Sequence, residues 1–200
     1  MTQPQGNYFN KYTSGNPVYR KLMTNFFSSL EKCLREIEFQ RVYEAGCGEG
    51  YVTAHIAQSR FDIEIHASDI STEVVKQAKM LCPNVNFSVG SVYQIDFPTD
   101  SFDLVVACEV LEHLETPETA IQELLRVTKR YLLLSVPNEP VWRICNVLRG
   151  KYFSDLGNTP GHIQHWSTTA FRSLVEQSCD ILKQEVPFPW TMLLCEKRKL

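Results

Sequence analysis

Short apolar runs alternate with amphipathic segments over most of the chain after residue 40. Each run has the length of a strand and is bounded by turn residues. The runs predict strands at Arg41–Ala45, Ile63–Ser68, Val85–Val89, Phe102–Cys108 and Tyr131–Val136. Helical segments begin between them, near Glu49, Ser71 and Thr116. This alternation, with short connections, predicts a parallel sheet that is covered by helices on both faces.

Helical periodicity also precedes this region, and two further strands follow it. Apolar residues recur at helical spacing from Val18 to Ile37, which predicts an amphipathic helix over residues 17–38. Another helix is expected to begin at Ser167, and the closing strands are expected at Ile181–Val186 and Trp190–Lys197. Only Pro187–Pro189 separates those two strands, so we expect them to form an antiparallel hairpin.

Residues 137–166 interrupt the pattern with prolines and glycines, among which aromatic residues are scattered. Irregular segments of this length often cover binding sites, so we expect a lid here. No repeat or linker divides the chain. We therefore predict one domain over residues 1–200, with an N-terminal cap region at residues 1–40.

Charge and composition exclude several classes of protein. Twenty Lys and Arg against 23 Asp and Glu give a formal net charge of −3, whereas nucleic-acid binders carry strongly basic surfaces. The longest apolar runs are too short for a membrane span. The 7 cysteines are widely spaced and no signal-peptide pattern is present, which favours a cytoplasmic protein with reduced thiols. The oligomeric state is left open.

The sharpest local feature is the glycine segment Glu44-Ala45-Gly46-Cys47-Gly48-Glu49-Gly50, between a predicted strand and a predicted helix. Glycines let the backbone approach a ligand, and a helix start offers free N–H groups. A dinucleotide-binding loop has a third glycine where this chain has Tyr51. Glu44 and Glu49 would repel a pyrophosphate but suit a cationic nucleoside such as S-adenosylmethionine.

Asp69 stands at the end of the second predicted strand, downstream of the glycine segment. An acidic residue at this position of a nucleotide-binding sheet accepts hydrogen bonds from ribose hydroxyls. The alternative is that Asp69 only caps the helix that follows at Ser71. The glycine segment upstream favours the ribose role.

These segments resemble the class I S-adenosylmethionine-dependent methyltransferases of the small-molecule type, related to the methyltransferases of quinone biosynthesis. The resemblance covers residues 42–136 and, more loosely, 161–174. It implies an α/β fold of Rossmann-like, doubly wound type. The implied sheet is seven-stranded and mostly parallel, with an antiparallel last strand, in a three-layer sandwich.

The resemblance also implies which residues bind the cofactor, S-adenosyl-L-methionine. The glycine segment matches the motif that holds the methionine part, Asp69 and Ile70 match the ribose and adenine position, and Gly90-Ser91-Val92 matches the turn at the adenine edge. The family usually has Asp where this chain has Ser91, which can still accept one hydrogen bond. The implied cofactor-binding set is Glu44, Gly46, Cys47, Gly48, Glu49, Gly50, Asp69, Ile70, Ser91, Val92 and Cys108.

Catalysis requires alignment and exclusion of water, and a general base only if the acceptor arrives protonated. His113 and His162 are the candidates for such a base. Glu109 and Glu112 share helical spacing with His113, so the three would face one way on a helical turn. They could serve packing and capping, His113 could act as a base, or the three could bind a divalent metal. The resemblance to a metal-assisted subset of the quinone-methylating group is the basis of the metal alternative.

The predicted function is methyl transfer to an unidentified small-molecule acceptor at O, N or C, with residues 137–166 lining its pocket. The alternatives are a non-catalytic module that binds the cofactor or its demethylated product, and a nicotinamide-dependent oxidoreductase. An N-terminal basic and aromatic group could fold over the cofactor; its members are Tyr8, Phe9, Lys11, Tyr12 and Arg20.

Overall fold

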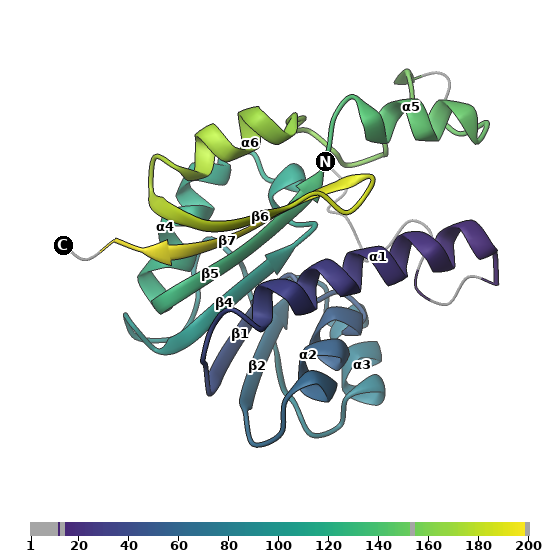
Figure 1. The fold of residues 1–200 in the computed structure, drawn as a ribbon. Helices are drawn as coiled ribbons and strands as arrows, with labels where there is room; N and C mark the ends of the chain where they lie inside the picture. The colour runs from purple at the N-terminus through teal and green to yellow at the C-terminus, as the bar shows by residue number, and fades with distance from the viewer. Residues whose placement is uncertain (1–11, 13–14, 153–154, 199–200) are drawn as a thin grey trace.

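The computed structural model describes residue 12, residues 15–152 and residues 155–198. Its centre is a seven-stranded sheet in the order β3-β2-β1-β4-β5-β7-β6 (Figure 1). The strands are β1 (Arg41–Ala45), β2 (Glu64–Asp69), β3 (Asn86–Val89), β4 (Phe102–Cys108), β5 (Thr128–Pro137), β6 (Cys179–Glu185) and β7 (Trp190–Lys197). Neighbouring strands are parallel except that β7 runs antiparallel to both β5 and β6. The predicted sheet, with its antiparallel last strand and closing hairpin, is confirmed.

Helices cover both faces of this sheet (Figure 1). One face carries α1 (Pro17–Leu34), α2 (Tyr51–Ser59) and α3 (Thr72–Leu81), and the other carries α4 (Pro117–Val127) and α6 (Thr168–Val175). Side chains alternate along a strand, so Val42 of β1 packs under α1 while Tyr43 packs under α4. Central strands are therefore apolar on both sides, as in doubly wound sheets. None of the helices in the described part of the chain combines the length and apolar character that a bilayer crossing needs.

The first helix is shorter than its apolar spacing predicts. It ends at Leu34, and the side chains that follow alternate in burial, with Ile37 and Phe39 inside and Glu38 exposed. Arg60 Nη2 donates to the carbonyl oxygens of Leu34 and Ile37 at 3.0 and 2.7 Å. The bond to Leu34 satisfies a carbonyl group that the helix end leaves without a partner, and the bond to Ile37 holds the segment that follows.

Residues 137–166 are only partly irregular, which corrects the expectation of an unstructured excursion. They contain a helix, α5 (Val141–Leu148), that begins directly after Pro140. A short 3-10 helix, η1 (Leu111–His113), follows β4. Figure 1 shows α5 standing beyond the end of the sheet, near the start of α1. These two elements and the carboxyl ends of the strands surround the cavity described next.

Candidate active site

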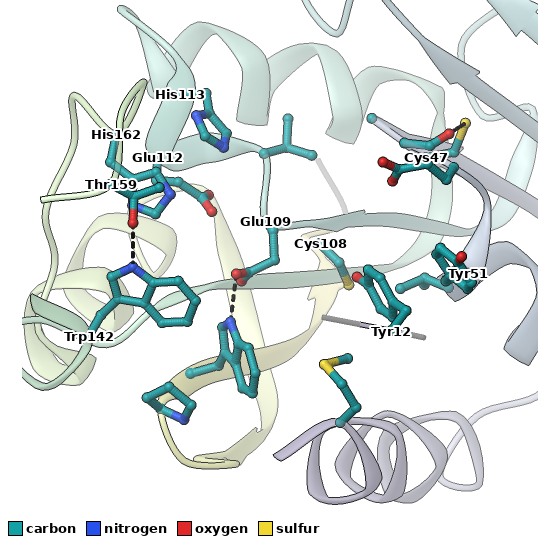
Figure 2. A pocket seen from close by; sticks show the side chains of 18 of the residues that line it. Tyr12, Cys47, Tyr51, Cys108, Glu109, Glu112, His113, Trp142, Thr159 and His162 are labelled. Carbon is teal, nitrogen blue, oxygen red and sulfur yellow. Dashed lines mark hydrogen bonds between the residues drawn. The ribbon is translucent and has the colours of Figure 1, made fainter. Parts of the chain in front are cut away.

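A cavity of about 480 Å³ opens along the carboxyl ends of β1, β2 and β4 (Figure 2). Ligands of open α/β sheets bind at this edge. One half of the cavity, called the loop half, is lined by Glu44, by Gly46–Glu49 and by the residues after β2 and β3. The other, called the aromatic half, is lined by η1, α5, the start of α1 and the turn before β7.

Two glycines of the segment between β1 and α2 occupy positions where a side chain would clash. The N–H groups of Gly46 and Cys47 both donate to the Ser68 carbonyl, at 2.8 and 2.9 Å, which fastens the loop to β2. Gly46 has a φ of 71°, and a Cβ there would lie 2.4 Å from Val110 Cγ2. Gly50 has a φ of 86°, and its Cβ would lie 3.2 Å from Ala78 Cα. Gly50 thus lets the start of α2 pack closely against α3, and its contact with the cofactor stays a prediction.

Glu44 places a carboxyl group at the base of the loop half. It is 2% exposed, and Thr53 Oγ1 donates a short hydrogen bond to its Oε2. Burial, reinforced by the Asp69 charge, raises the pKa of Glu44 from 4.5 to about 8. The basic residues of the described lining, Arg149 and Lys151, belong to the aromatic half. A cation in the loop half would therefore meet carboxyl groups from several directions.

Asp69 uses both carboxylate oxygens within the loop half. Oδ2 accepts from Gly48 N at 3.0 Å, and Oδ1 accepts from Ser71 N at 2.9 Å. Asp69 thus braces the glycine loop and also binds the start of α3, which joins the two roles considered from the sequence. Each carboxylate oxygen has a second acceptor site, which leaves capacity for a ligand hydroxyl. Ile70 lines the cavity beside it, with 46% of its surface exposed.

The remaining cofactor candidates also line the loop half: Cys47, Gly48, Glu49, Ser91, Val92 and Cys108. Ser91 Oγ accepts from Tyr93 N at 3.2 Å, so the hydroxyl that replaces the family's Asp is tied into its own turn. Burial, with Glu44 and Asp69 nearby, raises the pKa of the Cys47 thiol. The Cys47 side chain therefore lines the cavity as an uncharged thiol.

An aromatic stack that the sequence did not indicate covers part of the loop half. Tyr12 stacks on Tyr51 at 4.4 Å between ring centroids, with planes 13° apart. Burial, and secondarily the charge of Glu109, raises the pKa of the Tyr12 phenol well above its usual value. Of the N-terminal group, Tyr12 alone among described residues lines the cavity, since Arg20 lies outside the lining. Residues Tyr8, Phe9 and Lys11 lie outside the described part of the chain.

Two indoles wall the aromatic half. Trp142 and Trp190 lie 5.6 Å apart, measured between ring centroids. Trp142 Nε1 donates to Thr159 Oγ1 at 2.9 Å, and Trp190 Nε1 donates to Glu109 Oε2 at 2.6 Å; Figure 2 marks both bonds with dashed lines. Each ring is held at its polar end and presents its apolar body to the pocket.

The expected trio of Glu109, Glu112 and His113 does not form one face. Glu109 has a φ of 61°, outside the helical region, and its carboxylate turns to Trp190. The structure instead brings His162 from the excursion beside Glu112 and His113, with ligand atoms of the three within 4.8 Å of one another. Figure 2 shows this cluster at the end of the cavity away from Cys47 and Tyr51.

Both histidine candidates for a base thus lie in the cavity lining. They are far apart in sequence: His113 contacts the carbonyl oxygen of Gly161, which lies 48 residues further along the chain and directly before His162. The imidazole rings of His113 and His162 meet edge to face at 4.9 Å. His165, which shares the His162 motif, is exposed and contacts Asn158 Oδ1 at 2.8 Å. No local spacing rule links Glu112 to His162, so their contact could be found only in the fold.

Comparisons with known proteins agree with this geometry. Residues 43–133 match the family model described as a methyltransferase domain. An uncharacterised methyltransferase of Schizosaccharomyces pombe is 33% identical over 100 residues, covering 44% of this chain and 36% of that protein. The demethylmenaquinone methyltransferase of Renibacterium salmoninarum is 32% identical over 90 residues, covering 45% and 37%. The chain thus matches about a third of the length of these relatives.

Solved structures share the whole architecture. The magnesium protoporphyrin IX methyltransferase of Synechocystis, crystallised with bound S-adenosylhomocysteine, superposes with a TM-score of 0.69 at 19% identity. The match covers 94% of this chain and 91% of that one. At that identity the likeness establishes the fold alone. The chain therefore has the class I Rossmann-like methyltransferase fold, and its residues 43–133 are similar to the methyltransferase domain of this family.

Proposed function

We propose that this chain transfers a methyl group from S-adenosylmethionine to a small-molecule acceptor by in-line displacement. The observation that carries the proposal is one cavity with two chemically different halves, a carboxyl-lined glycine loop and an aromatic pocket that meets it. The relatives named above support a methyltransferase over a nicotinamide-dependent enzyme. The net charge of −3 argues against nucleic acid as the acceptor.

The loop half suits the cofactor's charge. S-adenosylmethionine, when bound, supplies a methyl group on a cationic sulfur that is a good leaving group. Glu44, Glu49 and Asp69 surround the glycine loop with carboxyl groups, which favour a ligand that carries an ammonium and a sulfonium. The backbone of Gly46 and Gly48 allows close approach, and Ile70 and Val92 offer apolar contact for a flat base.

His113 is placed to handle the acceptor's proton. Its Nδ1 lies 2.9 Å from the Gly161 carbonyl oxygen, which can only accept a hydrogen bond. Nδ1 therefore carries the hydrogen, and in the neutral ring Nε2 keeps its lone pair. Nε2 of His113, or the ring of the adjacent His162, could take a proton from an acceptor hydroxyl or amine. The two indoles and the Tyr12–Tyr51 stack would exclude water.

Ligand binding gives the first test. S-adenosylhomocysteine should raise the melting temperature and bind with one-to-one stoichiometry in calorimetry, whereas NAD and NADP should do neither. Replacing Asp69 by Asn should weaken binding about tenfold or more, because one of its two backbone partners is lost. Asp96, which is exposed, provides the matched Asp→Asn control.

Turnover gives the second test. Release of S-adenosylhomocysteine should be measured with acceptors that carry hydroxyl, amine or activated carbon groups. Turnover with any of them that disappears in the Asp69→Asn variant supports the proposal. Preference for NAD over S-adenosylhomocysteine would overturn it, and tight cofactor binding without turnover on any acceptor would assign the chain to the non-catalytic modules.

A further inference from the structure

We propose that Glu112, His113 and His162 bind one divalent transition-metal ion, such as Zn²⁺, in the aromatic half of the cavity. One ligand atom from each side chain lies within 4.8 Å of the others. A tetrahedral zinc ion needs ligand atoms about 3.3 Å apart at bond lengths near 2.0–2.1 Å. Binding of the ion would therefore require side-chain rotations that bring these atoms closer by up to about 1.5 Å.

The backbone already holds the two ligand-bearing segments together. The N–H groups of Ile163 and Gln164 both donate to the Glu112 carbonyl, at 2.9 and 3.0 Å. Gln164 Nε2 donates to the Leu114 carbonyl at 3.0 Å. The excursion is therefore fastened to η1 at the point where their ligand residues meet, so the site is organised before any ion arrives.

The orientation of His113 is typical of a metal ligand. Metal-bound histidines usually donate their second ring N–H to a carbonyl or carboxylate, which fixes the tautomer and directs the other nitrogen to the ion. Nδ1 of His113 makes such a contact with the Gly161 carbonyl at 2.9 Å. Nε2 is consequently the nitrogen that would bind the ion. Gly161 lies next to His162 in the chain, so one short segment both orients a ligand and supplies one.

The donor set determines the class of ion. Two imidazoles and one carboxylate suit Zn²⁺, Fe²⁺ or Co²⁺, whereas Mg²⁺ and Ca²⁺ prefer sites made wholly of oxygen ligands. Glu112 and His162 are 1% and 7% exposed, so an ion there would be largely shielded from water on the protein side. All three residues line the cavity, which leaves the remaining coordination positions on its open side.

An ion at this place would select the acceptor. It would bind an acceptor oxygen and lower the pKa of that hydroxyl, so the proton would leave to solvent before the oxygen attacks the methyl carbon. The two imidazoles would then act as ligands and not as a general base. This role rests on the proposed function and narrows the acceptors to hydroxyl or enol compounds, whereas ion binding itself does not depend on methyl transfer.

Metal titration without cofactor tests the site. The full chain is stripped with a chelator and titrated with Zn²⁺ in competition with a chromophoric chelator, and with Co²⁺ followed by its visible absorption. One equivalent should bind, and Mg²⁺ should not compete at millimolar concentration. Each of Glu112→Gln, His113→Gln and His162→Gln should weaken Zn²⁺ binding on the order of 100-fold or more.

Matched controls separate this site from other metal-binding groups. Glu115→Gln and His165→Gln change exposed residues beside the cluster and should leave affinity unchanged. Cys47 and Cys108 also line the cavity, so a sulfur-to-cobalt charge-transfer band would assign the ion to thiolates and overturn the proposal. Failure of Zn²⁺ to bind, or binding that survives in all three ligand variants, would overturn it too. S-adenosylhomocysteine affinity, measured on the same samples, reports the proposed function separately.

Discussion

Replacing Glu44 by Gln should reveal the cost of keeping a carboxyl group buried at the cofactor loop. Glutamine keeps the size of the side chain, and its amide oxygen can still accept the hydrogen bond from Thr53 Oγ1. The variant removes only the ability to ionise. Its stability relative to the wild type should therefore depend on pH in a way that other Glu→Gln changes do not reproduce.

The sign and size follow from the raised pKa. Between pH 4.5 and about 8 the folded chain holds a proton on Glu44 that the unfolded chain has lost, so wild-type stability falls as pH rises through this range. The pKa difference of Glu44 between the folded and the unfolded chain corresponds to about 5 kcal/mol of stability, at about 1.4 kcal/mol per pH unit. That is an upper limit, because local relaxation and water entry reduce it. The free energy of unfolding of Glu44→Gln, relative to that of the wild type, should therefore rise with pH up to about 8 and stay constant above it.

Urea unfolding at a series of pH values measures this difference, with the exposed Glu118→Gln as the control. Calorimetry with S-adenosylhomocysteine adds a second readout. The ligand ammonium would favour ionised Glu44, so binding to the wild type below pH 8 should release close to one proton and strengthen as pH rises. The Glu44→Gln variant should bind more weakly and lose most of that pH dependence.

A stability difference between Glu44→Gln and the wild type that stays constant from pH 4.5 to 8 would refute the reasoning. It would mean that Glu44 ionises normally in the folded chain. Equal proton release by both proteins would separately refute the pairing of Glu44 with the ligand ammonium, while leaving the burial argument intact.

Three further predictions concern packing. Gly50→Ala should lower the free energy of unfolding in urea by about 1–3 kcal/mol, since it forces a side chain into a left-handed backbone against Ala78; a change below about 0.5 kcal/mol contradicts this. Phe26→Ala should lower the free energy of unfolding by about 3–5 kcal/mol, because the buried ring packs against Trp190 at 5.3 Å between ring centroids. A loss well below that range would contradict this and mean that the surrounding core collapses into the space left by the ring. Burial raises the pKa of Cys33 to about 12, so alkylation followed by mass spectrometry should find it unreactive until the chain unfolds; labelling in the folded state would disprove it.

Local patterns predicted most of the fold. The bounds of β1, β4 and β7 agree with the sequence prediction because each apolar run ends at polar or turn residues. β5 begins earlier than predicted, at Thr128, because Thr128 still pairs with Phe102 of β4 across a shift in register at Lys129 and Arg130. The helix α5 was missed because prolines precede it, a glycine follows it, and its 8 residues make only about two turns.

The two halves of the cavity differed in how far they could be predicted. The loop half depends on residues that are close in sequence, so one strand–loop–helix pattern located Glu44, Gly46 and Gly48 together. The aromatic half is assembled by tertiary contacts. Trp190 and His162 reach it from separate segments, and the positive φ of Glu109 has no reliable signal in sequence.

The place of β7 between β5 and β6 has a consequence for synthesis of the chain. The last described strand to emerge from the ribosome must enter the sheet between two strands made earlier. Until it does, the backbone N–H and C=O groups of β5 that later pair with β7 form an open edge that can pair with other chains. Trp190 at the start of β7 also packs against Phe26 of α1, so the core beneath α1 is incomplete until β7 has been made. A nascent chain stalled before residue 190 is therefore expected to be a target for chaperones.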